Sequence, residues 1–119
     1  MLSVPSQEEM RRVAEPQPVL VIVRHNGQYT VSDDEGHVMR LQPDGVKVKD
    51  LQAWPALERT TRWDGGALVT EVTLSSGARV TQTYTTEDEG LRLVITTRVE
   101  GGHSRNPLTY KSVYDQALQ

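Results

Sequence analysis

The sequence contains no cysteine, no phenylalanine and no long apolar run. Without cysteine the chain has no disulfide framework, no thiol nucleophile and no cysteine-ligated zinc site. The apolar run at 19–23 has the length of one strand, whereas a membrane-spanning helix needs about 20 apolar residues. Only 36% of the residues are hydrophobic and two are tryptophan, so we expect a modest core of Val, Leu and Ile with a few large rings.

An excess of charge of one sign is also missing. The 13 basic and 16 acidic residues give a formal net charge of -3, and both signs are interspersed along the chain. A nucleic-acid partner would require a basic face, so we predict no such partner and no membrane span. A chain of 119 residues is expected to form one domain.

One short segment carries helical signals. Ser6 and Glu9 have the spacing of a capping box, and Pro16 ends the pattern. We therefore predict an N-terminal segment over 1–17 with a short helix at 6–15, followed by a single β-meander domain over 18–119. A helix of about ten residues is marginal alone, so this one is expected to dock on the sheet or to fray.

From Pro18 onward, apolar and polar residues alternate between turn signals, which is typical of half-buried strands. Asn26-Gly27 is the strongest hairpin signal because both residues tolerate positive φ. Further turn signals lie at 33–36, 43–45, 64–66, 75–77, 87–90 and 101–107. The pattern predicts an all-β fold, an antiparallel meander that forms a small barrel of eight or nine strands. A half-barrel is the alternative.

Turn lengths predict the register of the second half. The turn at Gly65-Gly66 pairs Trp63 with Leu68, the loop at 75–77 pairs Val72 with Val80, and a four-residue loop at 87–90 pairs Tyr84 with Leu93. A slip of one residue would expose the whole apolar set. The resulting inward face comprises Leu57, Arg59, Thr61, Trp63, Leu68, Thr70, Val72, Leu74, Val80, Gln82, Tyr84, Leu91, Leu93, Ile95, Thr97, Val99, Leu108, Tyr110, Ser112 and Tyr114.

Several of these inward positions are polar, and an unpaired buried polar group costs about 1–3 kcal/mol. They either pair with one another and with water, or line a cavity that receives a ligand. Arg59 is suited to clamp a carboxylate; alternatively, its strand is an edge and its side chain reaches solvent. The inward rings either stack on a ligand or simply form the core. The predicted ligand-binding residues are Arg59, Trp63, Leu68, Gln82, Tyr84, Leu93, Ile95 and Tyr110.

Motifs for catalysis are absent from the sequence. There is no Gly-x-Ser-x-Gly elbow, no phosphate-binding loop and no inward pair of carboxylates. His37 follows the acidic residues 33–35, but without the spacing of a ligand set. We therefore predict that the protein is not an enzyme and has no metal site and no cofactor.

A set of motifs between residues 59 and 115 carries a resemblance: Arg62-Trp63-Asp64-Gly65-Gly66, Leu68-Val69-Thr70-Glu71, Val80-Thr81-Gln82-Thr83-Tyr84, Leu91-Arg92-Leu93-Val94-Ile95-Thr96-Thr97 and Val113-Tyr114-Asp115. In this order they resemble a family of small, uncharacterised bacterial secreted or envelope β-domains with a lipocalin-like meander. The resemblance implies a periplasmic or secreted protein, although no secretion signal is visible and a cytoplasmic location remains open. It implies no catalytic residue.

Together these observations predict a non-catalytic β-barrel that binds a small apolar or amphipathic anionic ligand in the bacterial cell envelope. The alternative is a protein-protein interaction or structural module that uses its outer face or an open sheet edge. In either case we expect a monomer or a weak homodimer.

Overall fold

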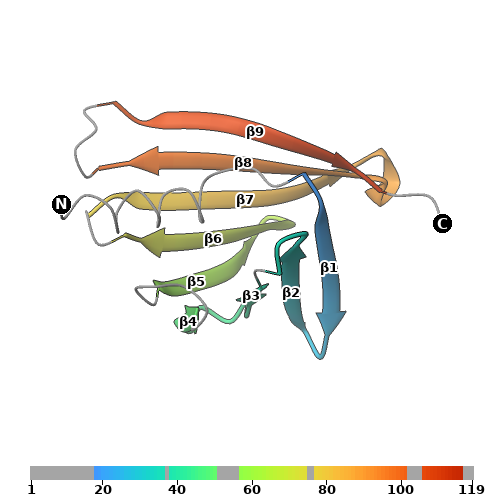
Figure 1. Ribbon diagram of the computed structural model, residues 1–119, viewed down its shortest axis with the longest axis horizontal. Coiled ribbons are helices and arrows are strands. Elements are labelled where there is room, and N and C mark those ends of the chain that lie inside the picture. Colours follow the sequence, from blue (N-terminus) through green and yellow to red (C-terminus); the bar gives the residue numbers. More distant parts are fainter. Residues whose placement is uncertain (1–17, 37, 51–56, 75–76, 102–105, 117–119) are drawn as a thin grey trace.

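The computed structural model describes residues 18–116 except 37, 51–56, 75–76 and 102–105, and for residues 49, 50 and 57 it describes the backbone alone. The predicted segment 1–17, with its helix, lies outside the described residues. The described chain is all-β (Figure 1). Its strands are β1 (Leu20–His25), β2 (Gln28–Asp33), β3 (Val38–Leu41), β4 (Val48–Asp50), β5 (Leu57–Asp64), β6 (Ala67–Thr73), β7 (Arg79–Glu87), β8 (Arg92–Glu100) and β9 (Leu108–Asp115), with a 3-10 turn η1 (Asp88–Gly90) between β7 and β8.

The strands form two antiparallel sheets in chain order. The small sheet has the order β1-β2-β3 and the large sheet has the order β4-β5-β6-β7-β8-β9. The predicted meander is therefore confirmed, but among the described residues it does not close into a barrel. The closed-barrel prediction is not supported, because β3 and β4 belong to different sheets instead of continuing one ladder.

The break between the sheets lies at Pro43-Asp44-Gly45. The Asp44 carboxylate accepts the Val46 amide at 3.0 Å and the Gln42 side-chain amide at 2.9 Å. These two bonds, the Val46 amide first, hold the pKa of Asp44 below its ordinary value. The Gly45 amide donates to the Thr61 carbonyl at 3.0 Å, so this loop is fastened to β5. A proline and a locally capped turn interrupt the ladder where a barrel would have to continue it.

Three hairpins have the predicted register. In the first, Asn26 and Gly27 have φ of 52° and 78°, and Ile22 lies opposite Val31. The turn at Gly65-Gly66 aligns Arg59 with Val72, Thr61 with Thr70 and Trp63 with Leu68. Gly77, at φ 89°, donates its amide to the Leu74 carbonyl, and Val72 lies opposite Val80. Turn chemistry therefore determines these pairings.

The predicted pairing of β7 with β8 is wrong by two residues. Tyr84 lies opposite Ile95 rather than Leu93, and Gln82 lies opposite Thr97. The connecting loop still has four residues, but it runs from 88 to 91, because Glu87 continues β7 and pairs with Arg92. Arg92 also contacts the carboxylates of Asp88 at 3.4 Å and Asp115 at 3.1 Å, which holds this end of the strands together.

A shift of two residues leaves every strand residue on its predicted face, because side chains alternate with a period of two. Leu91, which was predicted to face inward, lies in the loop and is 59% exposed. Trp63 and Leu108 were also predicted to face inward, but they are 52% and 59% exposed.

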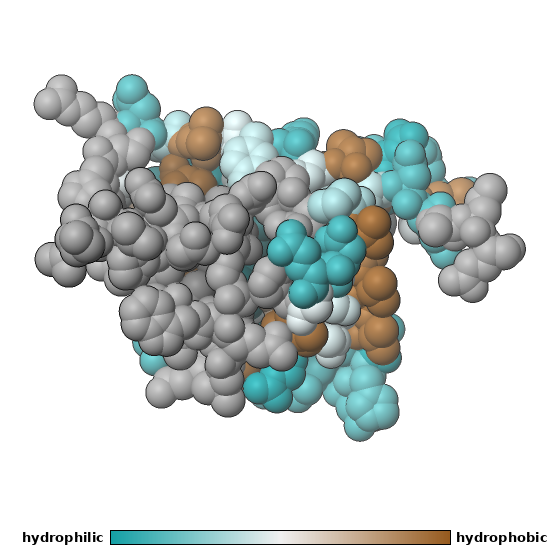
Figure 2. Space-filling view, in the orientation of Figure 1, coloured by the Kyte–Doolittle hydropathy of each residue, from teal (hydrophilic) through white to brown (hydrophobic). Residues whose placement is uncertain are grey.

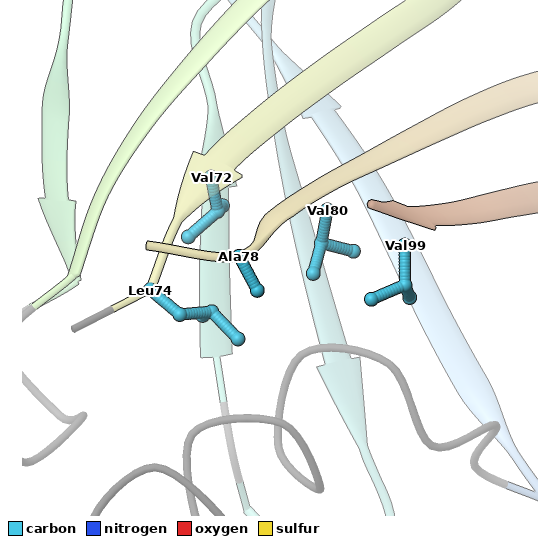
Figure 3. Packing of buried hydrophobic residues seen from close by; sticks show 5 residues of the cluster. All are labelled: Val72, Leu74, Ala78, Val80 and Val99. Carbon is cyan, nitrogen blue, oxygen red and sulfur yellow. The ribbon is translucent and has the colours of Figure 1, made fainter. Parts of the chain in front are cut away.

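The small sheet packs across one end of the large sheet. Val31 and Leu41 contact Leu68, Tyr84 and Ile95, and together these five buried residues form the junction core. Figure 1 shows β1 and β2 running across the direction of β7 and β8. A second group of buried residues, the end core, occupies the other end of the large sheet. Its side chains point to one side of that sheet (Figure 3), and they are Val72, Leu74, Ala78, Val80 and Val99.

Candidate functional site

A row of polar side chains crosses the inner face of the large sheet. Register aligns Thr61 with Thr70, Thr70 with Gln82, and Gln82 with Thr97. These four residues, the polar row, are all buried, as is Arg59 beside them. The sequence prediction that polar groups lie inward is therefore confirmed. In the register of the strands, the polar row lies between the two cores, with Val72 and Val80 on one side and Leu68 and Tyr84 on the other.

Arg59 is the charged group of this site. Its side chain is 4% exposed, and its Nη1 donates to Thr70 Oγ1 at 2.8 Å. The alternative of an edge strand with a solvated arginine is wrong, because β4 pairs along the outer side of β5 and places Val48 opposite Arg59. A buried guanidinium is costly unless hydrogen bonds and polar neighbours stabilise it. The hydroxyl of Thr70 supplies one such bond.

Gln82 and Tyr84 extend the site along β7. The Gln82 side-chain amide donates to Thr97 Oγ1 at 3.4 Å, a long bond between two members of the polar row. Burial raises the pKa of the Tyr84 phenol above its ordinary value. The charge of Arg59 acts in the opposite direction, and the Tyr114 phenol adds to the rise. Tyr84 is therefore neutral at pH 7 and within electrostatic range of Arg59.

The raised pKa of Tyr84 predicts a loss of stability in alkali. The unfolded chain releases this proton near pH 10, whereas the folded chain holds it to higher pH. The stability contributed by the neutral Tyr84 phenol is fully present below the pKa of the unfolded chain. It is lost as the pH rises through the pKa of the folded chain. We expect the free energy of unfolding to fall less steeply above pH 10 in Tyr84→Phe than in the wild type, measured by urea titration. Identical slopes would contradict the assignment.

The structure divides the predicted ligand-binding residues between two environments. Arg59 and Gln82 lie on or beside the polar row, and Tyr110 follows it in register, opposite Thr97, where it packs against the end core. The residues Leu68, Tyr84 and Ile95 belong to the junction core, and Leu93 packs against it. For Tyr84, the structure therefore agrees with the alternative that inward rings form the core.

Trp63 differs from the other predicted residues because it is 52% exposed. Its ring meets that of Tyr29 in an edge-to-face contact, with the centroids 6.0 Å apart and the planes at 75°. It therefore lies at the border between the two sheets rather than deep inside the large one.

Two features of the site escaped the sequence analysis. Thr70 was placed on the inward face but was not predicted to contact Arg59, although its hydroxyl accepts a hydrogen bond from Arg59. The register contained this signal, since Arg59 opposite Val72 places Thr70 diagonally across on the same face. Val31 and Leu41 had no such signal, because contacts between sheets are not encoded in strand alternation.

Within the described ranges, the structure shows no group of three or more histidine, aspartate or glutamate side chains that could hold a metal ion. None of the described segments is a helix that is long and apolar enough to cross a bilayer. The candidate site is therefore the polar row with Arg59.

No protein-family model, no curated protein and no solved structure matches this chain.

Proposed function

We propose that this protein is a non-catalytic binding module that receives an amphipathic anionic ligand on the inner face of its large sheet. The observation that carries the proposal is a guanidinium, buried to 4% exposure, fastened to Thr70 on a row of hydroxyl and amide groups. A buried guanidinium is stabilised when an anion pairs with it.

The chemistry of the site suits a carboxylate head group. Arginine presents planar donors that match the two oxygens of a carboxylate. Gln82, which lies two residues from Val80 on the same face, can orient the head group through its amide. Tyr110, opposite Thr97, offers a hydroxyl from the neighbouring strand. A ligand anion would thus meet one cation and two neutral hydrogen-bonding groups.

In this proposal the apolar tail of the ligand lies between the two sheets. Leu68 and Ile95 lie one step along the strands from the polar row, and the small sheet covers them through Val31 and Leu41. Because the fold is two sheets rather than a closed barrel, a tail would enter by separating these side chains, which are buried in the structure. Leu93 and Trp63 border this path, and part of the contact between the sheets would be exchanged for contact with the ligand.

Calorimetric titration with a series of fatty acids tests the proposal. We expect saturable binding that strengthens with chain length, because each added methylene buries apolar surface. Arg59→Ala should weaken binding by about 1.5–3 kcal/mol, the range for a hydrogen bond to a charged group. Arg62→Ala is the matched control, since Arg62 lies on the same strand but is exposed, and its affinity should equal that of the wild type.

Absence of saturable binding in the wild type, or equal affinities in the two arginine variants, would contradict the proposed function.

The proposed setting is the bacterial cell envelope, periplasmic or secreted, and it rests on the resemblance described above. Cell fractionation of the native host tests it separately.

The open edges of the sheets favour a second candidate function, that of a protein-protein interaction module. β1 ends the small sheet and β9 ends the large one. Both strands expose large apolar side chains, Val21 and Val23 in β1 and Leu108 and Val113 in β9. Such edges provide backbone groups and apolar surface for a partner strand.

A further inference from the structure

The edge strand β1 is unusually apolar. Residues 19–23 read Val-Leu-Val-Ile-Val, and four of them, all but Leu20, are large hydrophobics exposed by 41% or more. In Figure 2, brown atoms follow the position at the right of the molecule where Figure 1 draws β1. Edge strands are ordinarily protected by a charge, a proline or a bulge, and residues 19–23 contain neither a charge nor a proline.

Among the described residues no strand pairs with the outer edge of β1, and this edge has a definite pattern of backbone groups. The two-residue turn Asn26-Gly27 makes His25 and Gln28 a hydrogen-bonded pair, and such pairs recur at every second residue. Val23 and Val21 therefore direct their backbone groups toward β2. The amides and carbonyls of Leu20, Ile22 and Arg24 point the other way, to the free edge.

We propose that two copies of this chain pair through antiparallel β1 strands, with Ile22 at the two-fold axis. Ile22 then lies opposite Ile22 of the second copy, and Leu20 lies opposite Arg24. This register uses the outward amides and carbonyls of all three residues in each copy, and a slip in either direction uses fewer. The three strands of each small sheet would join into one continuous sheet.

Charge favours the antiparallel arrangement. The β1–β2 hairpin carries Arg24 and His25 at its turn, and the acidic residues 33–35 at its other end, where Leu20 lies opposite Asp33. Antiparallel pairing brings Arg24 of one copy beside Leu20 of the second copy. Leu20 is itself paired with Asp33 of that second copy, so Arg24 lies one strand away from this carboxylate. A parallel pair would instead align like charges, which is unfavourable.

The side chains agree with this register. Val21 of one copy would lie opposite Val23 of the other in a non-hydrogen-bonded pair, the position at which side chains approach most closely. Both valines are more than half exposed in the single chain. The inference names the partner for the second candidate function and rests on that function, and it is independent of the ligand site at Arg59.

Single cysteines test the register, because the chain has no cysteine of its own. In the proposed dimer, the two copies of residue 22 have Cα atoms about 5.5 Å apart, within the span of a disulfide. The two copies of residue 21 lie diagonally, at about 7–8 Å. Under mild oxidation, Ile22→Cys should form a disulfide-linked dimer, whereas Val21→Cys, and Val46→Cys at an exposed position outside β1, should remain largely monomeric.

Sedimentation and native mass spectrometry test pairing without a disulfide. The wild type should show a concentration-dependent dimer. Ile22→Lys places two ammonium groups at the axis and should raise the dissociation constant more than about tenfold. Val46→Lys, an exposed valine outside β1, is the matched control and should leave it unchanged. Arg24→Glu is a second variant, at an exposed position where substitutions usually change stability little, and it should also weaken the dimer.

A wild type that remains monomeric up to about 1 mM would overturn the proposal. So would a dimer that Ile22→Lys and Arg24→Glu leave intact, or cross-linking of Val21→Cys as rapid as that of Ile22→Cys. A monomer whose β1 instead captures a strand from another protein would keep the interaction function and remove the second copy as its partner. Fatty-acid titration reports on the ligand proposal alone, so the two failures are distinguishable.

Discussion

Replacing Leu41 by alanine is expected to lower the free energy of unfolding by about 2–5 kcal/mol. Leu41 is 1% exposed and extends from the small sheet into the junction core, where it meets Leu68, Tyr84 and Ile95. Alanine would leave a cavity where the two sheets touch, so lost apolar burial and lost packing add together. Urea unfolding followed by tryptophan fluorescence measures the change, since Trp63 lies at the border between the sheets.

Leu108→Ala is the matched control for this prediction. Leu108 lies on the edge strand β9 and is 59% exposed, so its replacement should change the free energy of unfolding by no more than about 0.5 kcal/mol. If the two leucine variants were equally stable, the small sheet would not be packed on the large one. The cavity in Leu41→Ala also lies on the proposed path of the ligand tail, so tighter fatty-acid binding by this variant would support that path.

Thr70→Val is expected to destabilise the protein by about 1.5–3 kcal/mol. Valine fills nearly the same volume as threonine but cannot accept the hydrogen bond from Arg59 Nη1, which is 2.8 Å long. Thr70 is completely buried, so water does not replace the lost acceptor without rearrangement of the site. Thr70→Ser retains the hydroxyl and should be less destabilising. Urea unfolding at pH 7 measures both variants.

A double-mutant cycle separates this hydrogen bond from other effects of the substitution. In an Arg59→Met background the charged donor is absent, so Thr70→Val should then change stability by much less. Thr83→Val, on the outer face of the adjacent strand β7, controls for the general effect of valine in a strand. Equal destabilisation by Thr70→Val in both backgrounds would show that the bond to Arg59 is not what Thr70 contributes.

The local sequence pattern was sufficient to predict the register of the hairpins. Asn26-Gly27 and Gly65-Gly66 accept positive φ at little cost, and a two-residue turn permits one register for its strands. Alternation then assigned each strand residue to a face, and the inward direction of Arg59 and the polar row followed from that assignment. The burial of Arg59 did not follow, because it depends on β4 pairing along the outer side of β5.

The local sequence pattern was insufficient to predict the position of the loop between β7 and β8. Loops at 87–90 and at 88–91 have the same length and place the same strand residues inward, so alternation cannot distinguish them. The pairing of Glu87 with Arg92 is compatible with only the second. The positive φ of Asp88 and Glu89 and the contact of Arg92 with Asp88 accompany this loop, and strand alternation predicts none of them.

The sequence by itself determined the strands, most of their partners and the side chains on each face, because turn geometry and the period of two act over a few residues. Only the tertiary structure decided that the meander divides into two sheets, that Leu41 and Val31 cover Leu68 and Ile95, and that Thr70 holds Arg59. These outcomes depend on how faces pack in space. Many arrangements bury the same apolar face equally well, and choosing among them requires shape complementarity between side chains that are far apart in the chain.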